Sequence, residues 1–91
     1  MINVQQTGNA ELMEFSVTIE ETSGHTQHQV TMSQSTYKEL TGTKVSPSEC
    51  VEAAFKFLLD REPKESILSH FDITVISTYF PNFERDLLNY L

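Results

Sequence analysis

The sequence predicts an α+β fold, in which an N-terminal antiparallel β-hairpin packs against a bundle of three to four short helices. Two patterns lead to this prediction. Residues 13–20 alternate between apolar and polar side chains, which is typical of a half-buried strand. Residues 47–61 instead space their apolar side chains at helical intervals behind strong capping signals. A chain with both patterns is expected to bury a sheet against helices.

The length of 91 residues suits one domain, which we place at residues 11–91. Residues 1–10 are polar, contain the pair Gly8-Asn9, and are expected to be loosely ordered. Ile2 and Val4 could add a short strand, which we do not predict.

The hairpin begins with a strand whose apolar face alternates with polar positions. That face consists of Met13, Phe15, Val17 and Ile19. Residues 21–24 form a turn, in which Gly24 can adopt a positive φ. A second strand follows, with His28, Val30 and Met32 on one face. A lone hairpin is marginally stable in water, so its apolar face must pack on the helices.

The main helix is predicted from about residue 47 to about residue 61. Ser46 can cap its first turn, Pro47 suits its first position, and Glu49 can close a capping box. Glu52 and Lys56 are spaced to form an ion pair across one turn. The buried stripe is expected to include Val51, Ala54, Phe55, Leu58 and Leu59.

Shorter helices are predicted around this one. Residues 33–42 should form a helix with Tyr37 and Leu40 turned inward and Gly42 at its end. A C-terminal helix after Pro81 is expected to bury one face. That face consists of Phe83, Leu87 and Leu91.

The secondary structure of two segments after Pro63 is predicted from their apolar spacing and residue types. The spacing of Ile67, Leu68 and Phe71 predicts a short amphipathic helix that ends near His70. The β-branched residues of segment 73–79 favour a strand, whereas its apolar spacing and the possible cap at Asp72 favour a helix. We interpret segment 73–79 as a helix and keep the strand as the alternative.

The charge of the chain argues against several partners. The net charge is −7, and the six Lys and Arg residues are scattered along the sequence. Nucleic acids and anionic membranes are bound mainly through clustered basic residues, so neither is an expected partner. The N-terminal segment has no signal-peptide pattern, and no apolar run approaches the roughly 20 residues that span a bilayer. With a single Cys in addition, we expect a cytoplasmic protein.

No catalytic, cofactor-binding or metal-binding residue is predicted, and no cofactor is expected. His25 and His28 are three positions apart and therefore on opposite faces of a strand, which does not suit a zinc site. Cys50 could act as a nucleophile if His70 approached it and Asp72 oriented that histidine. The position of Cys50 beside the apolar stripe instead favours a core residue.

Two segments carry a resemblance to known proteins: AFKFLLDREP at residues 54–63 and ITVISTYFP at residues 73–81. They resemble a family of short uncharacterised bacterial proteins, and the resemblance covers most of the chain after Glu11. It implies a small bacterial protein of the cytoplasm. The shared motifs are apolar, so the resemblance implies no activity and no functional residue.

The sequence therefore favours a non-catalytic protein-interaction or adaptor module, which binds an unknown protein partner or itself. Its possible interaction surface comprises Tyr79, Phe80, Phe83 and Arg61, although the aromatic cluster also suits a core and an Arg61–Glu65 pair could hold the corner after the main helix. The alternative is a regulator of antitoxin or repressor type that binds DNA as a dimer. The acidic charge counts against this alternative.

Overall fold

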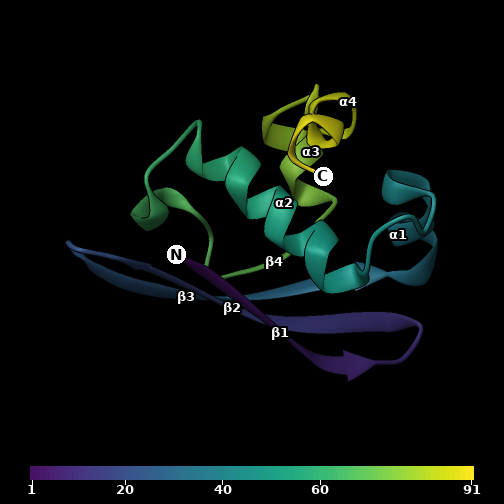
Figure 1. The fold of residues 1–91 in the computed structure, drawn as a ribbon, viewed down its shortest axis with the longest axis horizontal. Helices are drawn as coiled ribbons and strands as arrows, with labels where there is room; N and C mark the ends of the chain where they lie inside the picture. The colour runs from purple at the N-terminus through teal and green to yellow at the C-terminus, as the bar shows by residue number, and fades with distance from the viewer.

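The computed structural model describes residues 1–91 and has an α+β fold, as predicted (Figure 1). Four strands form one sheet, and the helices lie on one of its faces. The elements in chain order are β1 (Ile2–Asn9), β2 (Leu12–Glu21), β3 (Gly24–Ser33), α1 (Gln34–Thr41), α2 (Pro47–Leu59), the 3₁₀ helix η1 (Lys64–Ser66), β4 (His70–Asp72), α3 (Val75–Tyr79), α4 (Phe83–Asp86) and the 3₁₀ helix η2 (Leu87–Tyr90).

The strands follow the chain across the sheet, in the order β1-β2-β3-β4. β1, β2 and β3 are antiparallel neighbours, whereas β4 returns after the helices and runs parallel to β3. The predicted hairpin is thus the β2–β3 pair, with a turn in which Gly24 adopts a φ of 130°. The sheet is wider than the predicted hairpin by one strand on each side.

β1 corrects the expectation that residues 1–10 are loosely ordered. Its backbone pairs with β2 along the strand, with Ile2 opposite Ile19 and Val4 opposite Val17. Ile2 and Val4 pack against the core, while the alternate side chains of β1 are exposed polar groups. A polar segment of this kind becomes a strand because a neighbouring strand satisfies its backbone groups.

β4 corrects the second expectation, that Ile67, Leu68 and Phe71 share the inner face of a helix. The chain forms only the one-turn η1 after Pro63 and then extends beside β3. Phe71 turns toward α2, where its ring centroid lies 6.0 Å from that of Phe55. Ile67 is buried, but the side chain of Leu68 is 47% exposed. The gain from pairing with β3 and packing on Phe55 outweighs the local helical pattern.

α2 lies across the inner face of the sheet and forms the centre of the core (Figure 1). The predicted capping box is confirmed: Ser46 Oγ accepts from the Glu49 amide at 3.1 Å, and the Ser46 amide donates to Glu49 Oε1 at 2.9 Å. The predicted Glu52–Lys56 pair is also present, at 3.4 Å. The completely buried side chains of α2 are those of Cys50, Val51, Ala54 and Phe55.

The remaining helices agree in part with their predictions. α1 begins at the cap Ser33 and ends at Gly42 with a φ of 61°. Segment 73–79 contains a helix, α3, rather than a strand. The C-terminal segment divides into α4 and η2, which leaves Leu91 43% exposed although it was expected to be inward.

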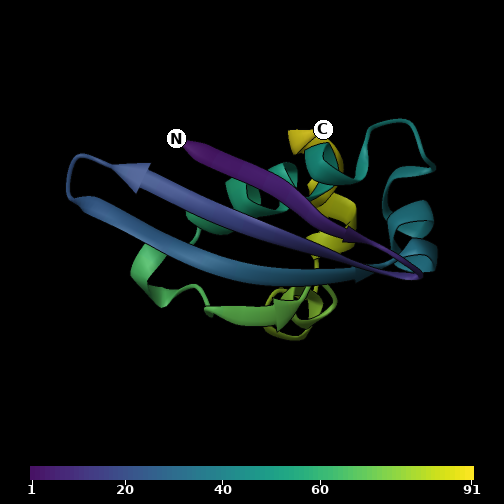
Figure 2. The ribbon, with the colours of Figure 1, turned by 90° about the horizontal axis from the view of Figure 1, so that it is seen from below.

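The outer face of the sheet has no layer packed on it (Figure 2). Its central positions carry uncharged polar side chains, among them Asn3, Gln5, Ser16, Thr18, Gln27 and Gln29. The helices and the hydrophobic core lie on the opposite side of the sheet.

Candidate functional site

An apolar groove lies beside β4, between the end of α2, the segment after η1, and α3. Its volume is about 360 Å³ and it is open to solvent. The residues that line it are Leu58, Glu62, Ser66, Ile67, Leu68, Phe71, Val75, Ile76, Tyr79 and Phe80. Two of these, Leu68 and Tyr79, are 47% and 67% exposed. An open groove with large apolar side chains at its rim is the feature expected at a contact site.

β4 is an edge strand, and its outer backbone groups are free. The Gln29 amide donates to Ser69 O at 2.7 Å, and the Ile73 amide donates to Thr31 O at 2.9 Å. Because successive residues of a strand point their backbone groups to opposite sides, His70 and Asp72 direct theirs away from β3. Figure 2 shows this edge without a neighbouring strand.

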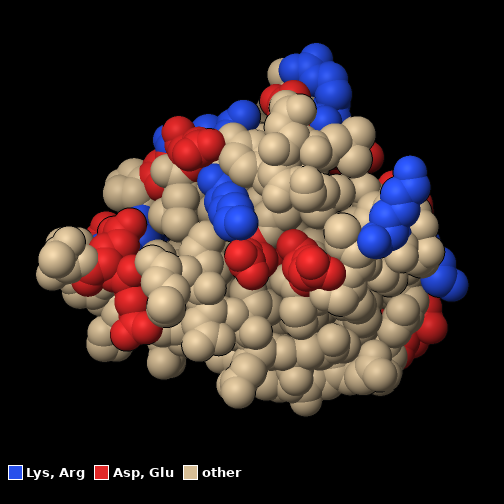
Figure 3. Space-filling model, viewed as in Figure 1, with Lys and Arg blue, Asp and Glu red and all other residues tan.

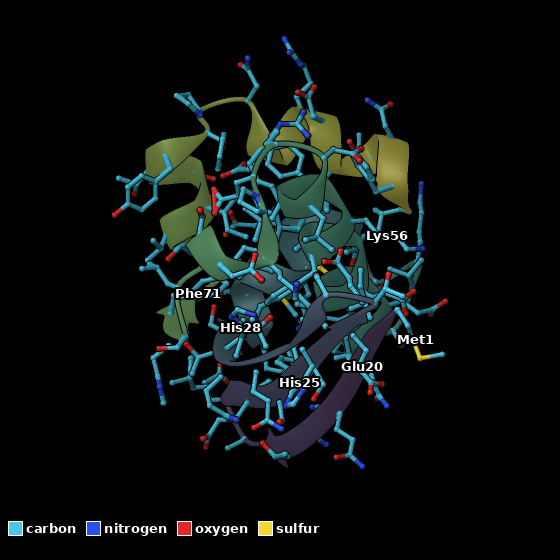
Figure 4. All side chains as sticks on the ribbon, turned by 90° about the vertical axis from the view of Figure 1, so that its left-hand side faces the viewer. Met1, Glu20, His25, His28, Lys56 and Phe71 are labelled. Carbon is cyan, nitrogen blue, oxygen red and sulfur yellow. The ribbon has the colours of Figure 1, made fainter.

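The inner side of β4 forms the floor of the groove. Phe71 contacts Phe55 and points between the sheet and α2 (Figure 4). His28 lies beside these rings, at 5.4 Å from Phe55, whereas His25 lies on the opposite face of the same strand. The free backbone edge of β4 and the apolar groove therefore lie next to each other along the three residues of this strand.

His28 fixes the backbone of the groove wall. Its Nδ1 lies 2.8 Å from Leu68 O, and its Nε2 lies 2.9 Å from Thr26 Oγ1. Since a carbonyl oxygen can only accept, Nδ1 carries the proton and donates to Leu68 O. The histidine is 2% exposed, so its role in the structure is to hold this wall from inside the core.

Lys64 holds the segment before the groove on the hairpin turn. Its side chain is 2% exposed, and its Nζ contacts Glu65 Oε2 at 2.7 Å, Glu21 Oε1 at 3.0 Å and Ser23 Oγ at 2.9 Å. The hydrogen bonds to Glu65 and Glu21 raise the pKa of the Lys64 ammonium above its usual value. The same contact with Lys64 lowers the pKa of Glu65.

The four predicted surface residues divide between the groove and its surroundings. Tyr79 and Phe80 line the groove. Phe83 is 1% exposed and belongs to the core, with its ring 5.0 Å from that of Phe57. Arg61 lies over the Phe57 ring, 3.6 Å from its centroid.

Arg61 does not form the predicted pair with Glu65. Its guanidinium instead donates to Phe57 O at 3.0 Å and lies 3.6 Å from Asp86 Oδ2, which ties the end of α2 to the C-terminal segment. Tyr90 joins the same cluster by donating to Asp60 Oδ2 at 2.6 Å. These contacts hold the end of α2 and the C-terminal segment together, so Arg61 has a structural role in this corner of the molecule.

The groove contains residues that the sequence analysis did not single out as surface residues. Leu68 and Phe71 were expected on the buried face of a helix, and no burial was predicted for Glu62 or Val75. No local pattern marks them as a group, because they meet only after β4 pairs with β3. The single usable signal was the aromatic pair Tyr79-Phe80.

The Cys50, His70 and Asp72 side chains do not converge. Cys50 is completely buried, and burial raises the pKa of its thiol to about 11. His70 and Asp72 alternate with the inward Phe71 on β4 and therefore occupy the open face of the sheet. Asp72 accepts from Thr31 Oγ1 at 2.6 Å and from the Thr74 amide at 3.0 Å.

No three His, Cys, Asp or Glu side chains are placed to hold a metal ion. None of the helices is both long and apolar enough to cross a bilayer. No protein-family model matches the chain, and comparisons with curated proteins and with solved structures found no match either.

Proposed function

We propose that this protein is a non-catalytic interaction module that binds an extended segment of a partner protein by strand addition to β4. The observation that carries the proposal is the free edge of β4 directly beside the apolar groove. In this mode of recognition, backbone hydrogen bonds hold the peptide and a pocket selects alternate side chains.

The backbone contribution comes from His70 and Asp72. Both direct an amide and a carbonyl group away from β3, and an added strand would pair with these groups. The edge is only three residues long, so the hydrogen bonds alone give a weak interaction. The side chains that enter the groove must therefore supply most of the affinity.

The groove favours apolar side chains of the partner. Side chains alternate between the two faces of a strand, so every second residue of an added strand would lie on the same face as Phe71 and enter the groove. There it would cover the exposed parts of Leu68 and Tyr79. Complete burial of one Leu, Ile or Phe side chain contributes about 1.5–3 kcal/mol, enough for selective binding when two such residues are present.

Charge adds a second preference. Glu62 lines the groove and has no ion-pair partner, and the chain as a whole carries a net charge of −7. A Lys or Arg beside the apolar residues of the partner would pair with Glu62 and would be attracted by the net charge. The proposed ligand is thus an extended peptide with alternating apolar residues and one basic residue.

Selection of random linear peptides displayed on phage tests this proposal, followed by fluorescence anisotropy with the selected peptide. We expect Leu68→Asp to weaken binding about tenfold or more, because the charge replaces an apolar wall. Leu12→Asp is the matched control, since Leu12 is 48% exposed and lies on the open face of the sheet. Equal binding by both variants, or no selected peptide, would contradict the proposal.

The DNA-binding alternative has less support. Four of the six basic side chains, those of Lys56, Arg61, Lys64 and Arg85, form ion pairs with carboxylates. Each of those cations is partly neutralised by its carboxylate partner, which weakens the attraction to phosphate groups that DNA binding requires. A salt-sensitive electrophoretic shift with mixed-sequence DNA would revive this alternative, and no shift at low salt would end it.

A further inference from the structure

The opposite edge of the sheet carries a separate inference. Met1 and Glu20 exchange two backbone hydrogen bonds, from the Glu20 amide to Met1 O at 2.8 Å and from the Met1 amino group to Glu20 O at 2.6 Å. Figure 4 shows the two residues side by side at this edge. Hydrogen-bonded and non-hydrogen-bonded pairs alternate in an antiparallel ladder, so Asn3 and Gln5 also point their backbone groups toward β2.

The backbone groups of the alternate residues must then point away from β2. Ile2, Val4 and Gln6 lie between those paired positions, so their amide and carbonyl groups face away from β2 along the free edge of β1. Natural edge strands are usually protected by charged side chains, proline or a bulge. β1 has no charge and no proline, and its one irregularity, between Gln6 and Gly8, leaves the segment before it regular.

The centre of this edge is also free of charged neighbours, because the β2 residues opposite Asn3, Val4 and Gln5 are Thr18, Val17 and Ser16. Figures 1 and 2 place β1 on the side that faces the reader in Figure 3, where the lower centre of the view carries no acidic or basic side chains and carboxylates are seen at its left and right borders. On α2, which contacts β1, Glu52 and Lys56 form an ion pair at 3.4 Å, and Glu49 accepts a hydrogen bond from the Ser46 amide. Two copies of a chain with a net charge of −7 repel each other. This repulsion is smaller where the facing strands carry no carboxylate, as in β1.

We propose that β1 pairs antiparallel with β1 of a second copy of this chain, about a two-fold axis at Val4. The outward residues form a self-complementary set in this register: Val4 faces Val4 of the second copy, and Ile2 faces Gln6. Every free backbone group between Ile2 and Gln6 then gains a partner. The contact is isologous and closed, as most protein dimers are.

The side chains fit the same register on both faces. On the helical side, Val4 meets Val4 of the second copy and covers apolar surface that is half-exposed in one copy. On the open face, Asn3 lies opposite Gln5 of the second copy, so two amides meet and no like charges do. The two sheets become one continuous sheet, with the β4 grooves at its far ends. The dimer therefore leaves the proposed peptide site free and does not depend on it.

Charge substitutions on the open face test both the dimer and its register. Asn3 and Gln5 are exposed, so Asn3→Glu with Gln5→Glu leaves the core intact while placing carboxylates opposite carboxylates across the axis. We expect sedimentation equilibrium to show a monomer–dimer equilibrium for the wild type. The dissociation constant of the dimer should be at least tenfold higher for this variant. Asn3→Lys with Gln5→Glu places opposite charges across the axis and should restore the dimer.

The matched control is Gln27→Glu with Gln29→Glu, which adds the same charge to the same face on β3, away from the edge. It should dimerise nearly as well as the wild type. A wild type that stays monomeric at every concentration, or a dimer that survives the first variant unchanged, overturns the proposal.

Hydrogen exchange of the wild type gives an independent readout that needs no variant. The amides of Ile2, Val4 and Gln6 should become more protected as protein concentration rises, while the amides of His70 and Asp72 should not. Concentration-independent exchange at Val4 would also overturn the proposal.

Discussion

His28 donates a hydrogen bond of 2.8 Å from its Nδ1 to the backbone oxygen of Leu68. This contact connects the interior of the sheet with the wall of the groove, across 40 positions in the sequence. Leu68 carries the exposed apolar side chain at the rim, and His28 keeps its backbone in place. The rigidity of the proposed site thus depends on a polar residue in the core.

Replacement of His28 by Phe should destabilise the protein. Phe retains the packing on Phe55 but leaves Leu68 O and Thr26 Oγ1 without their partner, at a cost of about 1–3 kcal/mol. Urea unfolding followed by circular dichroism measures this cost. His25→Phe is the control on the exposed face of the same strand, and its effect should stay within about 0.5 kcal/mol. Equal effects of the two variants would show that the His28 hydrogen bonds contribute nothing.

The Cys50 thiol should be unreactive in the folded protein. It is completely buried on α2, and burial raises its pKa to about 11, so almost no thiolate is present at neutral pH. Ellman's reagent should react slowly under native conditions and rapidly in denaturant. Rapid reaction of the native protein would place Cys50 at the surface.

The same shift predicts a loss of stability in alkali. The folded pKa of Cys50 lies above its value of 9.0 in the unfolded chain, so its contribution is present below pH 9.0 and is lost as the pH rises to about 11. Chemical unfolding across this range should show a steeper decline for the wild type than for Cys50→Ala. Parallel declines would contradict the burial of the thiol.

Phe55 is a completely buried side chain of α2 at the contact between this helix and the sheet. Phe55→Ala removes a large buried ring that contacts both His28 and Phe71, and should cost about 3–5 kcal/mol. Lys56→Ala, one position along on the exposed face, should cost no more than about 0.5 kcal/mol. Thermal melting distinguishes them, and a near-native melting temperature for Phe55→Ala would mean that another face of α2 is buried.

The start of α2 should depend on its capping box. Ser46→Ala removes the oxygen that accepts from the Glu49 amide, at a cost of about 1 kcal/mol.

Hydrogen bonds from the Ser46 backbone and side chain lower the pKa of Glu49 below its ordinary value of 4.5. Its stabilising contribution is therefore present above that pH and is lost in acid, so stability should fall less on acidification in Glu49→Gln than in the wild type.

The sequence predicted the elements that depend on local signals. The alternation of Phe15, Val17 and Ile19 identified β2, and the box of Ser46 and Glu49 identified the start of α2. These signals suffice because each residue interacts with near neighbours in the chain. Gly24 and Gly42 similarly marked a turn and a helix end, where positive φ values are required.

β1 and β4 could not be predicted in this way. Gln5 and Gln6 have no strand preference of their own, and the helical spacing of Ile67, Leu68 and Phe71 competes with the pairing of β4 to β3. The groove was missed for the same reason, because its floor at Phe71 exists only once β4 is in place. Phe83 had been expected both on the buried face of the C-terminal helix and on the possible interaction surface, and its burial agrees with the first expectation.

The central claim is that a partner peptide adds to β4 as a strand. Its most direct test compares two N-methylated analogues of one phage-selected peptide in fluorescence anisotropy, each methylated on alternate residues. Strand addition predicts that the analogue methylated at the amides facing His70 and Asp72 no longer binds, while the other binds as the parent does. Equal binding of both analogues would show that the groove holds the peptide without the β4 edge, which would contradict the claim.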